Sequence, residues 1–245
     1  MTKDGRPSRI CDIRYFHPER HSYLKGHEDG VAFGRRLAWF LNGEEFSVGA
    51  YTALYILLTP SIERGSVQIT DSGGDWWQRY TIVGVPEEFP NVDDAENLIK
   101  HATIAALKTI RPDLTEVIEN AARIAENNEG DLRFLLKTHK TKKFIIDISC
   151  NISVWPKESL LFLSITDLDS GAFLEAPPTP IKVYLDALGL AGAIKVTDST
   201  ISLLPNQSLA AQMAAARHGG SIEWAISEFL PREKPVLSRL IKPRG

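Results

Sequence analysis

Two segments in which apolar and polar residues alternate constrain the fold of this chain more than any other feature. The first runs from Phe46 to Leu58 and the second from Phe144 to Val154. Side chains on a β-strand point alternately to opposite faces, so each segment predicts a strand with one buried face. Between them, apolar residues recur three and four positions apart, which is typical of amphipathic helices. This order of elements predicts a globular α+β domain.

The two helical segments are residues 92–110 and 114–126, separated by Pro112. Asp94 and Glu96 lie in the first turns of the first segment, where the helix dipole favours negative charge. Each segment carries one apolar stripe and should therefore bury a single face. We expect a mainly antiparallel sheet covered on one side by these two helices, with a smaller mixed segment at the C-terminus.

Dipeptides typical of tight turns predict how the first strands connect. Asn42-Gly43 predicts a hairpin between 36–41 and 44–48, because a type I′ turn needs positive φ at both central residues. Gly73-Gly74 predicts a second hairpin. The first third of the chain is therefore predicted to be an antiparallel meander.

The proline-rich stretch 176–180 predicts a domain boundary, because such stretches are stiff and hard to pack. We expect an α+β domain over 1–175 and a smaller α+β subdomain over 181–245. Within that subdomain, helices are expected at 208–217 and 222–229.

Composition excludes several classes of protein. The 43% hydrophobic and 24% charged residues are ordinary for a globular protein, and the net charge of −3 gives no global argument for nucleic-acid binding. Cys150 lies on an apolar strand face, so a disulfide framework with Cys11 is not expected. The first residues lack the apolar core of a signal peptide, and the most apolar run, 53–58, is too short for a bilayer core of roughly 30 Å. A cytoplasmic location follows as an expectation.

Two short motifs have a functional and a structural interpretation. Asp71-Ser72-Gly73-Gly74 resembles the sequence around the nucleophile of chymotrypsin-like proteases, but Thr70 and Asp75 depart from that motif. A glycine turn explains both glycines directly. The basic run from Lys137 to Lys143 could hold phosphate or an acidic partner. At a hairpin tip, it is also what keeps a solvated turn from aggregating.

Carboxylates and histidines at strand ends and in one loop are candidate metal ligands. Thr-Asp pairs end three predicted strands, and three carboxylates at one sheet edge could hold a divalent cation. A loop with three histidines could hold zinc. Asp167 to Gly171 starts like a calcium loop but has its glycine at the wrong position. No set has diagnostic spacing, so we predict no metal and no cofactor. The residues concerned are Asp71, Asp167, Asp198, His17, His21 and His27.

An acidic stretch close to large aromatic residues is the candidate partner-binding surface. Acidic residues with aromatic anchors suit docking on a basic protein, whereas the structural alternative is helix-dipole complementation plus core tryptophans. Neighbouring residues on a strand point to opposite faces, so one of the paired tryptophans must face away from the main core. The candidate residues are Trp76, Trp77, Glu87, Glu88, Asp93, Asp94 and Glu96.

Residues 44–155 resemble small immunity proteins of bacterial polymorphic toxin systems. The resemblance is carried by Leu54-Tyr55-Ile56-Leu57-Leu58-Thr59-Pro60 and by Trp77-Gln78-Arg79-Tyr80-Thr81-Ile82-Val83-Gly84-Val85-Pro86. It implies a non-catalytic protein that binds a cognate toxin domain, and the acidic candidate surface implies that this partner is basic. Two alternatives remain. One is a hydrolase-type enzyme with an unorthodox carboxylate or histidine site, and the other is a non-catalytic adaptor or ligand-binding protein.

Overall fold

The computed structural model describes residues 7–17, 22–70 and 74–239. The chain forms two compact units that divide between Glu129 and Gly130. Both units contain helices and strands, so the fold is of the α+β class. Within the described residues, no helix is long and apolar enough to cross a membrane.

The described part of the first unit contains a five-stranded mixed sheet in the order β2-β1-β3-β5-β4. The three central strands are parallel, and the short strand at each edge is antiparallel to its neighbour. The strands are β1 (Asp12–His17), β2 (Ser22–Tyr23), β3 (Ala53–Thr59), β4 (Val67–Thr70) and β5 (Gln78–Gly84).

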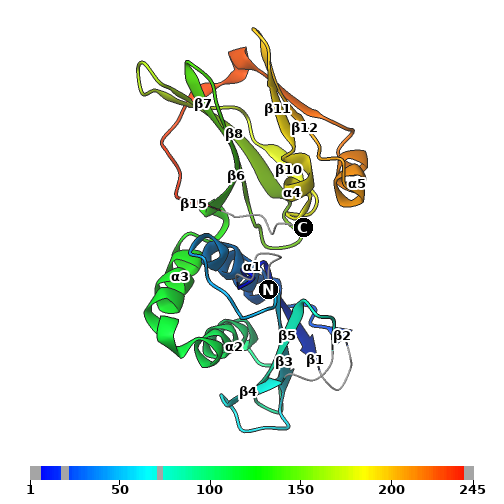
Figure 1. The fold of residues 1–245 in the computed structure, drawn as a ribbon. Helices are drawn as coiled ribbons and strands as arrows, with labels where there is room; N and C mark the ends of the chain where they lie inside the picture. The colour runs from blue at the N-terminus through cyan, green and yellow to red at the C-terminus, as the bar shows by residue number, and fades with distance from the viewer. Residues whose placement is uncertain (1–6, 18–21, 71–73, 240–245) are drawn as a thin grey trace. The chain divides into compact units, whose positions relative to one another are not determined.

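Three helices lie on one side of this sheet (Figure 1). They are α1 (Glu28–Gly43), α2 (Ala95–Ile110) and α3 (Thr115–Asn127). The predicted helices at 92–110 and 114–126 correspond to α2 and α3. The first helix, α1, was not predicted, and it connects the parallel strands β1 and β3. Its side chains Phe33, Leu37 and Leu41 are four residues apart and almost completely buried, which is why this segment is helical.

The predicted antiparallel meander is therefore wrong for the first third of the chain. Only the pairing of β4 with β5, which flank Gly73-Gly74, is the antiparallel hairpin expected. Asn42-Gly43 ends α1 instead of forming a hairpin. The Asn42 side chain is fully buried and donates to the Ile10 carbonyl at 2.7 Å, so tertiary contacts override its turn preference.

A glycine allows α1 to approach β1 closely. The Tyr15 hydroxyl lies 2.7 Å from Thr103 Oγ1 on α2, and Thr103 in turn donates to the Ile99 carbonyl. A Cβ atom at Gly34 would lie 1.9 Å from the Tyr15 hydroxyl oxygen. This helical position therefore requires glycine as long as Tyr15 occupies the space beside it.

In the second unit, the described residues form a seven-stranded sheet and a separate three-stranded sheet. The larger sheet is antiparallel except where β15 pairs with β6. Its strands are β6 (Arg133–Lys140), β7 (Phe144–Asn151), β8 (Ser159–Asp167), β9 (Phe173–Glu175), β10 (Thr179–Ile181), β14 (Leu230–Pro231) and β15 (Leu237–Arg239). The smaller sheet and its neighbouring helices are β11 (Ala193–Val196), β12 (Thr200–Leu204), β13 (Ile222–Ala225), α4 (Asp186–Leu190) and α5 (Leu209–Arg217).

The proline-rich stretch 176–180 lies within the larger sheet instead of between the predicted domains 1–175 and 181–245. It connects β9 to β10, and both strands pair with β8. Pro180 is tolerated in β10 because that strand is short and lies at an edge, where a missing N–H costs little. The predicted helix at 208–217 is α5, but the one at 222–229 is wrong, because this segment begins with β13.

Candidate functional site

The face of the first sheet opposite the helices carries the most distinctive cluster of side chains in the first unit. Strand alternation places Ile13 and Tyr15 of β1 toward α1 and α2, so Arg14 points to the other side. Because β1, β3 and β5 are parallel, Arg14 lies abreast of Tyr55, and Tyr55 lies abreast of Tyr80. The register of three parallel strands thus brings one cation and two phenols into a row.

Five aromatic rings form a continuous series across β2, β1, β3 and β5, and we call this series the aromatic face. Adjacent ring centroids are 4.4 to 5.9 Å apart, within the range in which aromatic pairs attract each other. Tyr55 lies at the centre, contacts three of the other four rings and is only 4% exposed. The aromatic face consists of Phe16, Tyr23, Tyr55, Trp77 and Tyr80.

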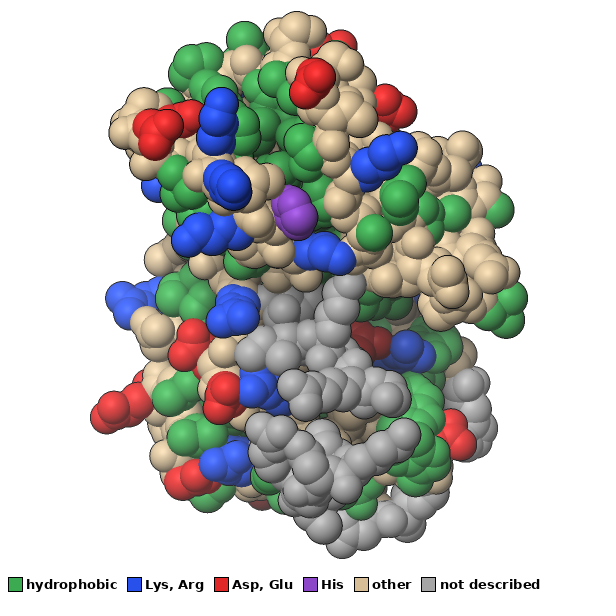
Figure 2. Space-filling view, turned by 45° about the horizontal axis from the view of Figure 1, so that its top comes forward, with side chains coloured by type: hydrophobic (Ala, Val, Ile, Leu, Met, Phe, Trp, Pro, Cys, Tyr) green, Lys and Arg blue, Asp and Glu red, His purple; other side chains and the backbone are tan. Residues whose placement is uncertain are grey.

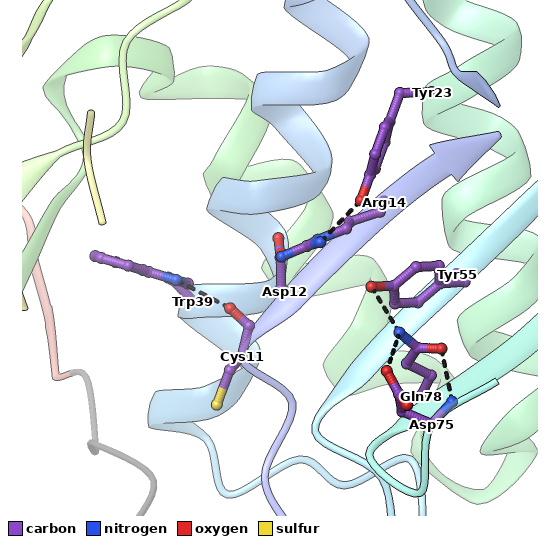
Figure 3. Close-up of polar contacts among 8 residues, drawn as sticks. All are labelled: Cys11, Asp12, Arg14, Tyr23, Trp39, Tyr55, Asp75 and Gln78. Carbon is purple, nitrogen blue, oxygen red and sulfur yellow. Dashed lines mark hydrogen bonds and ion pairs between the residues drawn. The ribbon is translucent and has the colours of Figure 1, made fainter. Parts of the chain in front are cut away.

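Gln78 connects β5 to Tyr55 at the centre of the aromatic face, and Figure 3 shows its hydrogen bonds with Tyr55 and Asp75. Its Nε2 donates to the Tyr55 hydroxyl at 3.1 Å and, more weakly, to Asp75 Oδ2 at 3.4 Å. Its Oε1 accepts from the Tyr80 hydroxyl at 2.8 Å and from the Asp75 backbone N–H at 3.0 Å. All four hydrogen-bonding positions of the amide are therefore occupied.

The electrostatics keep both phenols neutral and the arginine charged. Burial raises the pKa of Tyr55, with a smaller opposing effect of the Arg14 charge, and burial together with the Asp75 carboxylate raises the pKa of Tyr80. Burial would lower the pKa of Arg14, but the 2.6 Å hydrogen bond to Asp12, the charge of Asp12 and the hydrogen bond to Tyr23 together outweigh it, and the net shift is upward. Arg14 also donates to the Tyr23 hydroxyl and lies 5.7 Å from the Tyr55 ring centroid.

Trp76 and Trp77 occupy the centre of a β-turn that leads into β5. The Gln78 N–H donates to the Asp75 carbonyl at 2.9 Å, which closes the turn. Trp77 is half-buried, packs edge-on against Tyr55 and accepts backbone hydrogen bonds from Thr52 and Ala53. Trp76 is 80% exposed, the largest value for any large hydrophobic side chain in the described residues. The exposed member of the predicted pair is thus Trp76.

The predicted acidic residues lie away from the tryptophans. Trp76 and Trp77 precede β5, whereas the acidic stretch follows it, and a strand of this length separates them by about 20 Å. Glu96 has a structural role, because its carboxylate accepts a hydrogen bond from the Gly30 N–H in the first turn of α1 at 2.5 Å. The acidic residues that are exposed are Glu87, Glu88, Asp93 and Asp94.

The residues considered as metal ligands do not form a metal site where they are described. Asp167 Oδ1 accepts the backbone N–H groups of Asp169 and Ser170 and the Ser170 hydroxyl, and the hydrogen bonds from Ser170 are the main reason that its pKa is lowered. It therefore closes a turn. The rings of His17 and His27 both pack near Phe89, with centroids 5.7 and 6.0 Å from its ring. In the described ranges, no group of three His, Cys, Asp or Glu could hold a metal. Asp71 and His21 lie outside those ranges.

The basic run becomes the β6–β7 hairpin, as its turn interpretation requires. Lys137 points back into the second unit and donates to the Gly192 carbonyl. Lys140, Lys142 and Lys143 are exposed around the turn. Figure 2 shows Lys and Arg side chains on one face of the molecule, interspersed with hydrophobic and acidic ones.

Sequence reasoning missed two groups of residues. The first is Asp12 and Arg14. Their alternation with Phe16 can be seen in the sequence of β1, but Arg14 also contacts Tyr23 and Tyr55, which lie on other strands. The second is a partly buried cluster in the second unit, where the buried Asp186 accepts from the exposed Arg217 and lies 3.1 Å from His218 Nε2. Arg217 in the last turn of a predicted helix, followed by His218, was the only signal for it.

No protein-family model, no curated protein and no solved structure matches this chain.

Proposed function

We propose that this chain is a non-catalytic, cytoplasmic binding protein that recognises a protein partner through Trp76 and the aromatic face. The observation that carries the proposal is the contrast between the two tryptophans. Trp77 and the rings behind it are packed and hydrogen-bonded, whereas the adjacent Trp76 is 80% exposed. An exposed indole on a rigid support is what an interface anchor needs, because little conformational entropy is lost when it binds.

We further propose that the partner is a basic toxin domain that this protein neutralises. Residues 1–129 carry 14 Lys and Arg against 20 Asp and Glu, so the first unit is acidic overall. Four exposed acidic residues follow β5, and none of them is in an ion pair with another described residue. Unpaired charges of one sign attract a partner of the opposite sign and speed the encounter. The resemblance of residues 44–155 to immunity proteins supports the same class of partner.

The proposal predicts that a large toxin gene lies immediately upstream of this gene, and the test uses the toxin domain that it encodes. Binding is measured by biolayer interferometry for the wild-type protein, Trp76→Ala and the control Trp155→Ala, which removes a 65% exposed tryptophan from the second unit. We expect Trp76→Ala to raise Kd at least about tenfold, mainly through faster dissociation, with Trp155→Ala unchanged. Equal affinities for the two variants would overturn the proposal. Protection of cells that express the toxin should fall in the same order.

A further inference from the structure

Asp75, which precedes the exposed Trp76 in the sequence, is in no ion pair with another described residue. It lies in the same β-turn and is itself exposed. Among the described residues, its carboxylate accepts a hydrogen bond only from the Gln78 amide, at 3.4 Å from Oδ2. The turn therefore presents a negative charge and a large aromatic surface at adjacent positions.

The arginines of the neighbouring strands are occupied elsewhere. Arg14 forms hydrogen bonds with Asp12 and Tyr23. Arg79, one residue into β5, donates to the Val48 carbonyl at 2.7 Å and lies over the Tyr51 ring. Neither pairs with Asp75, so the carboxylate can interact with a cation that a partner supplies.

We infer that Asp75 and Trp76 together receive an arginine side chain of the protein partner. The inference rests on the proposed function and specifies the chemistry of its site. A guanidinium is planar and weakly hydrated, so it can stack on an indole while its N–H groups pair with a carboxylate. A lysine ammonium can satisfy the charge but cannot stack in the same way. Adjacent positions in a tight turn allow one guanidinium to contact both groups.

The geometry behind the turn favours such a contact. Gln78 binds the Asp75 backbone N–H and side chain as well as the Tyr55 and Tyr80 hydroxyls, so the turn is fixed to β3 and β5. The Trp77 carbonyl accepts two backbone hydrogen bonds from the start of β3. An arginine that docks here meets groups that are already positioned.

Three pentapeptides of the form acetyl-Gly-Gly-Xaa-Gly-Gly-amide test the inference without the toxin, with arginine, lysine or the uncharged citrulline at the central position. The readout is the indole N–H signal of Trp76 in a ¹H–¹⁵N spectrum, identified among the five tryptophans by its loss in Trp76→Phe. We expect the arginine peptide to shift this signal with millimolar affinity. The lysine peptide should bind about two- to five-fold more weakly, and the citrulline peptide should cause no shift.

Asp75→Asn and the matched control Glu116→Gln, which removes an exposed and unpaired charge from α3, complete the test. Asp75→Asn should weaken binding of the arginine peptide about two- to five-fold, and Glu116→Gln should leave it unchanged. Equal binding by both variants, or an equal shift with citrulline, would overturn the inference. If Trp76→Ala weakens toxin binding and Asp75→Asn does not, only the arginine contact is wrong. If Trp76→Ala leaves toxin binding unchanged, the proposed function fails as well.

Discussion

The Gln78 amide donates a hydrogen bond to the Tyr55 hydroxyl at 3.1 Å and so joins β5 to β3 across the aromatic face. The same amide also binds Tyr80 and Asp75, so one side chain connects the turn that carries Trp76 to the buried centre of the face. The turn that carries the exposed tryptophan is therefore hydrogen-bonded, through Gln78, to the buried tyrosine.

Replacing Gln78 with leucine should lower the free energy of unfolding by about 1–2 kcal/mol. The change removes four hydrogen bonds and leaves the Tyr55 and Tyr80 hydroxyls short of partners in a partly buried setting. Urea denaturation measures the effect. Gln68→Leu, on the exposed edge strand β4, is the matched control and should change stability by less than about 0.5 kcal/mol. Equal effects would show that the network does not stabilise the fold.

The two neighbouring tryptophans should differ sharply in their effect on stability. Trp77→Ala removes a ring packed against Tyr55 and should cost about 2 kcal/mol. Trp76→Ala removes an 80% exposed ring and should change stability by less than about 0.5 kcal/mol. Thermal unfolding of both variants checks this. A large loss of stability in Trp76→Ala would mean that its side chain belongs to the core, and its role as an anchor would have to be abandoned.

Gly34→Ala should destabilise the protein by about 1–3 kcal/mol, because the new methyl group would overlap the Tyr15 hydroxyl. Combining it with Tyr15→Phe removes the clashing oxygen and should recover part of the loss. In Tyr15→Phe alone, Thr103 keeps its hydrogen bond to the Ile99 carbonyl. A double-mutant cycle from denaturation data measures the coupling. Strict additivity of the two changes would contradict the predicted contact.

Asp186 should make the stability of the second unit depend on acid pH. Burial would raise its pKa, but hydrogen bonds from Arg217 and His218 outweigh this and lower it. A carboxyl group whose folded pKa lies below its unfolded value contributes stability above the unfolded pKa, and this is lost as pH falls through the folded pKa. Asp186→Asn should cost about 1–2 kcal/mol at pH 7, because the Arg217 side chain that loses its partner is partly exposed to solvent. Unfolding of the variant should be less sensitive to pH below about 4 than that of the wild type, and parallel pH profiles would contradict this.

The acidic stretch after β5 should act on the rate of toxin association. Reversing Glu87, Glu88 and Asp94 to lysine should slow association strongly at low salt and less at high salt, because long-range attraction is screened over about 8 Å at physiological ionic strength. Stopped-flow measurements over a salt series check this.

A control that reverses three exposed glutamates elsewhere, Glu44, Glu116 and Glu158, changes the net charge equally. It should slow association less than the reversal at Glu87, Glu88 and Asp94. Equal slowing would assign the effect to net charge alone.

The spacing of apolar residues within a single segment was sufficient to predict several helices and strands of this fold. The helical stripes that predict α2 and α3, and the alternation that predicts β7, follow from periodicity within a single segment. Strand alternation also predicts that one member of the tryptophan pair is exposed, but both residues lie in a β-turn before β5, so the turn and not the alternation separates them. These features depend on contacts between residues close in sequence or on burial of a single face.

Strand direction, domain division and the composition of the aromatic face were decided only by the tertiary structure. Whether β1 and β3 run parallel depends on the crossover helix α1, whose glycines weaken its local signal and whose Gly34 is explained only by Tyr15. Strand β5 runs parallel to β3 because the edge strand β4 comes between them in the chain. Residues 176–180 belong to the seven-stranded sheet because β9, which precedes them, and β10, which begins at Thr179, both pair with β8. Arg14, Tyr55 and Gln78 are brought together by a register between strands about 25 to 40 residues apart. Periodicity within a segment contains no information about which distant segment it pairs with, because pairing depends on the burial that the whole chain achieves.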